Sequence, residues 1–217
     1  MLYDKDIREP LFEYIEDNFG KVRIIEEKQI GKSRADVMLV MDEKLIGIEI
    51  KSDADTYARL ERQILDYNRC FDMNYVVVGT KHAAHITEHV PEWWGIITVE
   101  EYDDNDESTG NLKADFYMLR RPDLNPRRHY EFFRKRQLDF LWRPELLHIQ
   151  EIHGFPKYPG KSKKFVQDYI FENVPEEILK REITDELFER DYQEMVKKIT
   201  EYKEAHRKPR SRKRRKK

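Results

Sequence analysis

The chain has 217 residues, which is enough for one full domain with an appendage or for two small domains. A single cysteine, Cys70, excludes an intrachain disulfide and a cysteine-based zinc site. No apolar run approaches the roughly 20 residues that span a bilayer, and the N-terminus has no signal-peptide pattern. We therefore expect a soluble, cytoplasmic protein with no membrane partner.

Charge is distributed unevenly along the chain. The net charge is only −2, although 39% of the residues are charged. Residues 207–217 carry nine basic residues and no acid, so the remaining 32 basic and 43 acidic residues give the body a net charge of −11. An acidic body with a basic tail favours a polyanion as the partner of the tail. A solvated tail with no dedicated role remains the alternative.

The first half of the chain predicts a helix followed by three strands. Residues 4–19 place apolar side chains at helical spacing and end before Gly20, a typical helix stop. Three β-rich segments follow, and the short links between them predict an antiparallel meander. These segments lie at 21–30, 34–42 and 45–51, with a turn at 42–44.

The next segments alternate between helix and strand. Residues 55–72 carry an apolar stripe at steps of three and four, which predicts a helix. Two continuous apolar runs, at 75–80 and 95–100, are typical of strands buried on both faces. Residues 82–90 between them predict a short helix, and 113–121 one more strand. The order α-β-β-β-α-β-α-β implies a parallel crossover in a mixed α/β sheet.

The second half of the chain predicts helices only. Helix starts are expected at Asn125-Pro126, Pro144 and Pro175, and Gly154 is expected to end the second of these helices. Residues 155–164 are interpreted as a linker, and the last helix is expected to continue to about His206. The expected organisation is a core domain at 1–120, a helical extension at 121–206 and a basic tail at 207–217.

Two charged residues interrupt the apolar strand at 45–51. Alternation places Glu49 and Lys51 on one face of this strand, together with Gly47. A hairpin with its turn at 42–44 would bring Asp36 of the preceding strand beside Ile50 and the charged pair. The sequence therefore predicts two carboxylates and one ammonium group at one place on the sheet. Surface decoration is the competing interpretation.

Such a group of side chains has the parts needed to hydrolyse a phosphodiester. Two neighbouring carboxylates repel each other unless a cation joins them, and carboxylates with waters are the usual protein ligands of Mg²⁺ near phosphate. The ion polarises a phosphoryl oxygen and activates a bound water. A lysine at the same place can orient that water or stabilise charge on the phosphate.

The spacing of these residues resembles a known signature. Asp36, twelve intervening residues and Glu49-Ile50-Lys51 resemble the D…(D/E)xK pattern of the PD-(D/E)XK nuclease superfamily. The order helix, three-stranded meander, helix and strand is similar to the restriction-endonuclease-like core of that superfamily. Residues 48–99 also resemble a mostly uncharacterised bacterial and phage family of nuclease-like proteins. Ala35 stands where the signature has proline.

The resemblance implies a metal-dependent deoxyribonuclease that uses Mg²⁺, with Mn²⁺ as a substitute. Its expected metal ligands are Asp36, Glu49 and Ile50, and Lys51 is expected to assist the attacking water. It also implies an acid from the first helix, for which Glu13 is our candidate, with Glu9 and Glu16 as rivals. The Gln63 and Tyr67 pair, one helical turn apart, is similar to a Gln-x-x-x-Tyr pair in RecB-type members, which would make Gln63 catalytic. The alternative is that Tyr67 is a core residue and Gln63 only flanks it.

The expected partner is nucleic acid, with DNA favoured and RNA left open, and a homodimer is one assembly to test. The residues expected to contact nucleic acid are Arg34, Tyr67, Lys81, Arg207, Arg210, Arg212, Lys213 and Arg214. The basic, aromatic segment 125–137 could follow the nucleic-acid backbone or pack its aromatic residues on the first domain. Two other classes of function compete: a non-catalytic nucleic-acid-binding protein that uses the tail and helices, and a scaffold for a protein partner.

Overall fold

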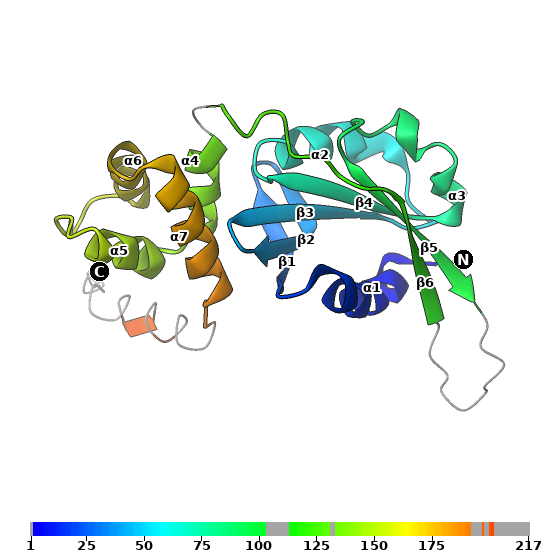
Figure 1. Cartoon of the computed structure of the whole chain (residues 1–217), viewed down its shortest axis with the longest axis horizontal. Helices are drawn as coiled ribbons and strands as arrows, with labels where there is room; N and C mark the ends of the chain where they lie inside the picture. Colours follow the sequence, from blue (N-terminus) through cyan, green and yellow to red (C-terminus); the bar gives the residue numbers. More distant parts are fainter. Residues whose placement is uncertain (1, 103–112, 131–132, 192–196, 198–199, 202–217) are drawn as a thin grey trace, which may run out of the picture.

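The computed structural model describes residues 2–102, 113–130, 133–191, 197, 200 and 201. It is a mixed α/β fold in which a six-stranded sheet carries helices on both faces, with a lobe of helices at one end (Figure 1). The order of elements along the first half is the expected α-β-β-β-α-β-α-β. No helix in the described part of the chain is long and apolar enough to cross a membrane.

The six strands lie in the sheet in the order in which they occur along the chain. The first three form an antiparallel meander, the third, fourth and fifth pair in parallel, and the sixth returns antiparallel to the fifth. They are β1 (Arg23–Ile30), β2 (Ser33–Met41), β3 (Lys44–Lys51), β4 (Met73–Gly79), β5 (Gly95–Tyr102) and β6 (Lys113–Arg120).

Two apolar layers cover the two faces of the sheet. Helix α1 (Asp4–Phe19) buries Ile7, Leu11 and Ile15, which are spaced four residues apart, on one face. Helix α2 (Leu60–Tyr67) covers the other face, and a short 3₁₀ turn, η1 (Tyr57–Arg59), precedes it. The helix expected over 55–72 is therefore shorter than predicted.

The segment between β4 and β5 also differs from expectation. In place of one helix over 82–90, the chain forms α3 (Thr80–Ala83) and the 3₁₀ turn η2 (Ile86–Glu88). Ile86 is fully buried, and the backbone N–H groups of His89 and Val90 both donate to its carbonyl oxygen. The segment thus consists of two single helical turns, and the second turn places Ile86 in the core.

The second half of the described chain folds into a lobe of short helices. They are α4 (Phe133–Gln137), the 3₁₀ turn η3 (Leu138–Phe140), α5 (Arg143–Ile152), α6 (Lys163–Asn173) and α7 (Glu176–Phe188). Pro144 lies in the first turn of α5, and Gly154 follows its end with a positive φ of 63°, as predicted. Helix α6 was not predicted; the side chain of Ser162 caps it by accepting a hydrogen bond from the Phe165 N–H, at 3.1 Å.

Two expected helix boundaries in this lobe are wrong. Asn125-Pro126 opens a turn, because the Asn125 side chain is buried and donates to the carbonyl oxygens of Asn68 and Phe71, at 2.9 and 2.8 Å. Helix α7 ends at Phe188, whose carbonyl accepts from the Arg23 guanidinium, and residues 189–191 are not helical. Residues 197, 200 and 201 are helical, and the rest of 192–206 lies outside the described residues.

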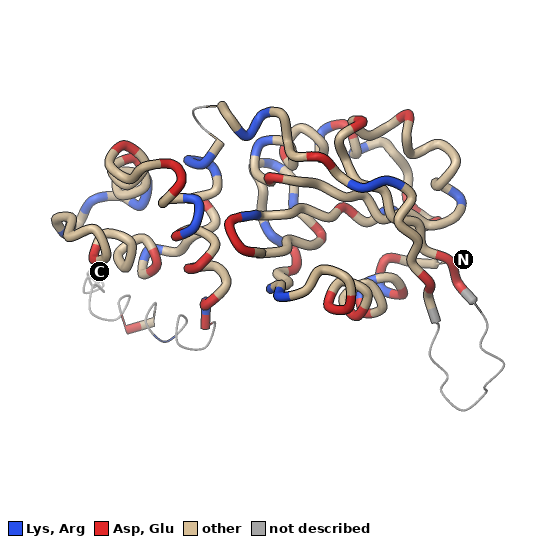
Figure 2. The backbone as a smooth tube through the Cα atoms, viewed as in Figure 1, with Lys and Arg blue, Asp and Glu red and all other residues tan. Residues whose placement is uncertain are grey.

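The sheet and the helical lobe share one apolar core. The cluster on the α2 face contains Met38 of β2, Tyr67 of α2 and Phe140, and it continues to Leu187 of α7. The acidic turn between β2 and β3 lies beside α7, where Glu43 forms an ion pair with Lys180 at 2.8 Å (Figure 2). The parts on either side of residue 120 are therefore packed together, while residues 207–217 lie outside the described residues.

A buried polar cluster reinforces this junction. Arg134 of α4 donates to the Asp72 carboxylate at 2.7 Å and to the Gln137 side-chain oxygen at 2.6 Å. The other Asp72 oxygen accepts from the Leu45 N–H and from Gln137, both at 3.0 Å. The basic segment 125–137 thus places Arg134 in a structural contact, and Lys135 pairs with Asp168 at 2.8 Å.

Candidate active site

The β2–β3 hairpin brings Asp36 and Glu49 together. The pairing of Val37 with Ile48 places Asp36 opposite Glu49, one residue from the predicted position beside Ile50. The difference arises because the turn contains two residues, Asp42 and Glu43, and Glu43 has a positive φ of 54°. The Asp36 side chain still reaches Ile50, whose backbone N–H donates to Oδ2 at 2.8 Å.

Glu49, Lys51 and Gln63 form one hydrogen-bonded group. The Lys51 ammonium donates to Glu49 Oε1 at 2.6 Å and to Gln63 Oε1 at 3.2 Å, and the Gln63 amide also donates to Glu49 Oε1. Glu49 is fully buried and Lys51 nearly so. Gln63 therefore contacts the charged pair, as the sequence predicted.

One oxygen of this group has no partner. Glu49 Oε2 is buried and accepts no well-formed hydrogen bond from the described residues. The Tyr67 hydroxyl lies close enough to lower the pKa of the Glu49 carboxyl, but it donates to the Ile48 carbonyl at 3.0 Å. A buried carboxylate oxygen without a donor is costly, because it has lost its water without compensation. Such an oxygen is a candidate ligand for a cation.

Tyr67 ties the backbones of β2 and β3 together. Its hydroxyl donates to the Ile48 carbonyl at 3.0 Å and accepts from the Asp36 N–H at 3.2 Å. The side chain is completely buried, so its expected contact with nucleic acid would require a rearrangement. A Cβ atom at Gly47 would lie 2.7 Å from the Tyr67 ring and 2.3 Å from the Phe71 ring, so this glycine makes room for these two aromatic rings, not for a ligand.

The electrostatics of the site reflect two carboxylates in a poorly hydrated place. Burial, and next the negative charge of Glu49, raise the pKa of Asp36 to about 7, against the hydrogen bond from Ile50 and the charges of Lys51 and Arg8. Burial also raises the pKa of Glu49, and the Lys51 charge opposes that rise. A cation placed between the two carboxylates would relieve both effects.

The donor set fits a magnesium-like ion with few protein ligands. No group of three or more His, Cys, Asp or Glu side chains in the described residues could hold a metal. Mg²⁺, however, is commonly held by one or two carboxylates, with waters and substrate phosphate as the remaining ligands. Asp36 and Glu49 supply two such carboxylates, and the unpartnered Oε2 supplies a vacant acceptor. Ile50 enters the site through its N–H bond to Asp36.

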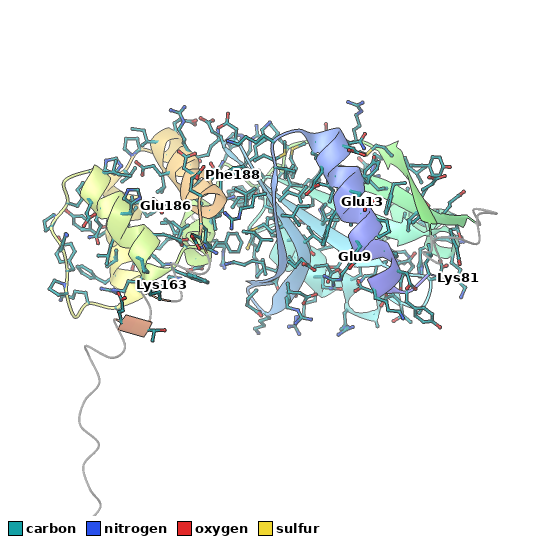
Figure 3. The ribbon with its side chains drawn as sticks, turned by 90° about the horizontal axis from the view of Figure 1, so that it is seen from below. Glu9, Glu13, Lys81, Lys163, Glu186 and Phe188 are labelled. Atoms are coloured by element: carbon teal, nitrogen blue, oxygen red, sulfur yellow. The ribbon has the colours of Figure 1, made fainter. Side chains whose placement is uncertain are left out.

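The first helix reaches the site through a residue that the sequence did not indicate. Glu13 is exposed on α1, as are its rivals Glu9 and Glu16 (Figure 3 labels Glu9 and Glu13). Arg8 of the same helix lies with Nη2 3.6 Å from Asp36 Oδ1, and its Nη1 donates to the Asp36 carbonyl at 3.4 Å. Because Arg8 is four residues from Asp4, its sequence context predicts only an ordinary helix ion pair.

The residues expected to bind nucleic acid lie around the site or outside the described residues. Arg34 is exposed and forms an ion pair with Glu27. Lys81 follows the end of β4, is exposed, and lies with its ammonium 3.5 Å from the Asp53 carbonyl (Figure 3). The five tail residues all lie outside the described residues; they are Arg207, Arg210, Arg212, Lys213 and Arg214.

Comparisons with other proteins identify the family of the chain. No curated protein sequence matches it. A solved structure, SfsA of Pyrococcus furiosus in complex with Ca²⁺, aligns with a TM-score of 0.34 and 17% identity over 55% of this chain, which spans 64% of the SfsA chain. The family model described as "Bacteriophage P4 protein cII" matches residues 3–214. The chain therefore belongs to the bacteriophage P4 protein cII family.

Proposed function

We propose that the chain is a metal-dependent nuclease that hydrolyses phosphodiester bonds in DNA, on a core of the PD-(D/E)XK type. The observation that carries the proposal is the buried Glu49 Oε2 without a donor, next to Asp36 on the neighbouring strand. Buried acceptors usually have a donor; Glu182 Oε2, in the ion pair with His153, also lacks one, but only at Glu49 does the open oxygen belong to an acid paired across two strands with the second site carboxylate, Asp36. Here Lys51 and Gln63 both donate to Oε1 and leave Oε2 for a ligand.

In this proposal Asp36 and Glu49 would hold Mg²⁺, or Mn²⁺ in its place, which would supply polarisation of the phosphate and a lower pKa for a bound water. The Lys51 ammonium, fixed between Glu49 and Gln63, supplies positive charge where charge develops on the phosphate oxygens. The Gln63 amide orients the attacking water. That water adds to phosphorus, one ester P–O bond breaks, and the departing oxygen gains a proton.

Binding would extend beyond these residues. Arg34 and Lys81 are exposed near the site, and the nine basic residues of 207–217 can neutralise backbone phosphates. The tail also supports the second candidate, a nucleic-acid-binding protein without catalysis. The described part of segment 125–137 favours that candidate less, because Arg134 and Lys135 are engaged by Asp72 and Asp168.

The test is cleavage by purified protein with Mg²⁺ or Mn²⁺ on single-stranded DNA, duplex DNA and RNA. We expect EDTA-sensitive cleavage that falls on the order of 10²–10³-fold in Asp36→Asn and in Glu49→Gln. Glu61→Gln is the matched control, since Glu61 is an exposed acid on the helix that carries Gln63. Glu13→Gln tests whether the first helix adds an acid.

Two results would overturn the proposal. One is the absence of cleavage of every substrate by pure wild-type protein with either metal. The other is wild-type cleavage in both site variants. Salt-sensitive DNA binding that is indifferent to EDTA and to Asp36→Asn, and is lost on deleting 207–217, would establish the binding-only alternative.

A further inference from the structure

Arg8 lies among four carboxylates beside the proposed centre. Its Nε lies 2.7 Å from Asp4 and its Nη2 2.7 Å from Glu27, whereas Glu26 and Asp36 lie 3.5 and 3.6 Å away. The short contacts show that Asp4 and Glu27 hold the guanidinium. The charge of Arg8 acts on Asp36 electrostatically, without a short hydrogen bond between the two side chains.

The backbone of β1 is distorted to make this arrangement. Glu27 has a positive φ of 55°, which is uncommon for a residue with a side chain. It lies between the paired positions Glu26–Val37 and Lys28–Ala35, level with Asp36 on the neighbouring strand. Backbone strain of this kind persists only where the surroundings enforce it, and it is common at functional sites.

The formal charges of the region do not cancel. Five carboxylates gather in and around the centre: Asp4, Glu26, Glu27, Asp36 and Glu49. The cations paired with them are Arg8, Arg34 and Lys51. With all five carboxylates ionised, two negative charges are left over, the charge that one divalent cation would neutralise.

We propose that Arg8 is a resident counter-cation that competes with the metal for Asp36 and binds a substrate phosphate once the metal is bound. The inference rests on the proposed nuclease function. A guanidinium stays charged at all working pH values, so its repulsion of a divalent ion at Asp36 is permanent. Its planar donors also fit phosphate in a bidentate way. Arg8 therefore weakens the binding of a metal ion in the absence of substrate. A bound substrate phosphate pairs with Arg8 and so ends its competition for Asp36.

The competition makes two affinities change in opposite directions. In Arg8→Gln, we expect Mn²⁺ to bind the nucleic-acid-free protein about tenfold more tightly, because a nearby positive charge has been removed. DNA binding in Ca²⁺, measured by fluorescence anisotropy, should weaken about tenfold, because a phosphate contact is lost. If Arg8 only anchored α1, its removal would weaken both affinities together.

The measurement is Mn²⁺ titration by calorimetry on the full chain without nucleic acid. Arg8→Lys keeps the charge and should bind Mn²⁺ as wild type does. Lys44→Gln is the matched control, because Lys44 is an exposed cation at the other end of the strand that carries Glu49, and its Mn²⁺ affinity should stay within about twofold of wild type. If Arg8→Gln does not fold, Asp4→Asn serves instead: it removes one holder of Arg8, leaves more of its charge to Asp36 and should weaken Mn²⁺ binding.

The outcomes separate the two proposals. Wild-type protein that binds no Mn²⁺ and cleaves nothing overturns the nuclease proposal. Wild-type protein that binds Mn²⁺, with equal or weaker binding in Arg8→Gln, overturns only the role of Arg8. Tighter Mn²⁺ binding together with weaker DNA binding in Arg8→Gln supports it.

Discussion

The chain contains two buried groups of the same composition, each with one acid, one base and one glutamine. At the lobe junction, both oxygens of Asp72 are paired with Arg134, Gln137 and the backbone of Leu45. In the candidate site, Lys51 and Gln63 crowd onto one oxygen of Glu49 and leave the other without a donor. We call the first group closed because both oxygens of its acid are paired, although Arg134 Nε has no hydrogen bond and lies 3.5 Å from Glu176; this group holds the fold together. The second is open and is arranged to receive a ligand.

The largest difference should appear when each group loses an acid. Asp72→Asn leaves the Arg134 charge buried without its partner, and we expect a loss of about 3–5 kcal/mol in the free energy of unfolding. Asp36→Asn removes a carboxylate that is destabilised by burial and by Glu49, and it should not reduce stability at pH 8. Urea unfolding of both variants measures the contrast.

Asp168→Asn controls for the Asp72 experiment, because its ion pair with Lys135 is only partly buried and should contribute about 1 kcal/mol or less. Equal losses in Asp36→Asn and Asp72→Asn would contradict the distinction between an open and a closed group.

A smaller effect should appear in the pH dependence of stability without metal. Because the pKa of Asp36 is raised to about 7, the folded state keeps a proton that the unfolded state releases above its ordinary pKa of 3.8. This contribution is complete below about pH 4 and is lost as the pH rises through about 7, by up to about 4 kcal/mol. The raised pKa of Glu49 acts in the same direction.

Unfolding free energies measured from pH 4 to 8 test this, with Asp36→Asn as the comparison. The variant should show a flatter profile, and Mn²⁺ at pH 8 should restore stability to the wild type but not to the variant. A wild-type profile that rises over this range would show that the two carboxylates do not repel each other.

Substitution of the two glutamines should have the smallest effects, and these effects should separate stability from cleavage. Gln137→Ala removes donors to the Cys70 carbonyl and to Asp72, and it should cost about 1–3 kcal/mol of stability with little effect on cleavage per folded molecule. Gln63→Ala, on a half-buried side chain, should cost less than about 1 kcal/mol and lower cleavage about tenfold. Cleavage rates and urea unfolding on the same samples decide between these patterns.

The open group was largely accessible from the sequence. Strand alternation placed Glu49 and Lys51 on one face, and the resemblance to RecB-type nucleases added Gln63 from the next helix. The one-residue error in the register of Asp36 came from the turn, whose length depends on the positive φ of Glu43. Arg8 could not be found, because its partners come from three elements whose packing is a tertiary property.

Less of the lobe junction could be predicted from the sequence. Asn125 followed by proline favours a helix start, but an asparagine also serves in turns, and its burial against Asn68 and Phe71 decided the outcome. Arg134 lies in a segment that reads as a solvated basic face, yet it is a core residue of the junction. The turn at Asn125 and the burial of Arg134 both depend on contacts between residues far apart in the sequence. Local sequence patterns do not reveal such contacts.

The shared core has a consequence for synthesis on the ribosome. The side chains of the candidate site, from Arg8 to Tyr67, emerge in the first third of translation. The apolar cluster on the α2 face of their sheet continues into the lobe at one end of the sheet, as far as Leu187 (Figure 1). A nascent chain that has just finished β6 therefore exposes the part of this cluster that packs against the lobe, which favours aggregation until the helices have been made. A stable sheet beneath the candidate site then requires the C-terminal helices, in addition to the acidic residues within the site.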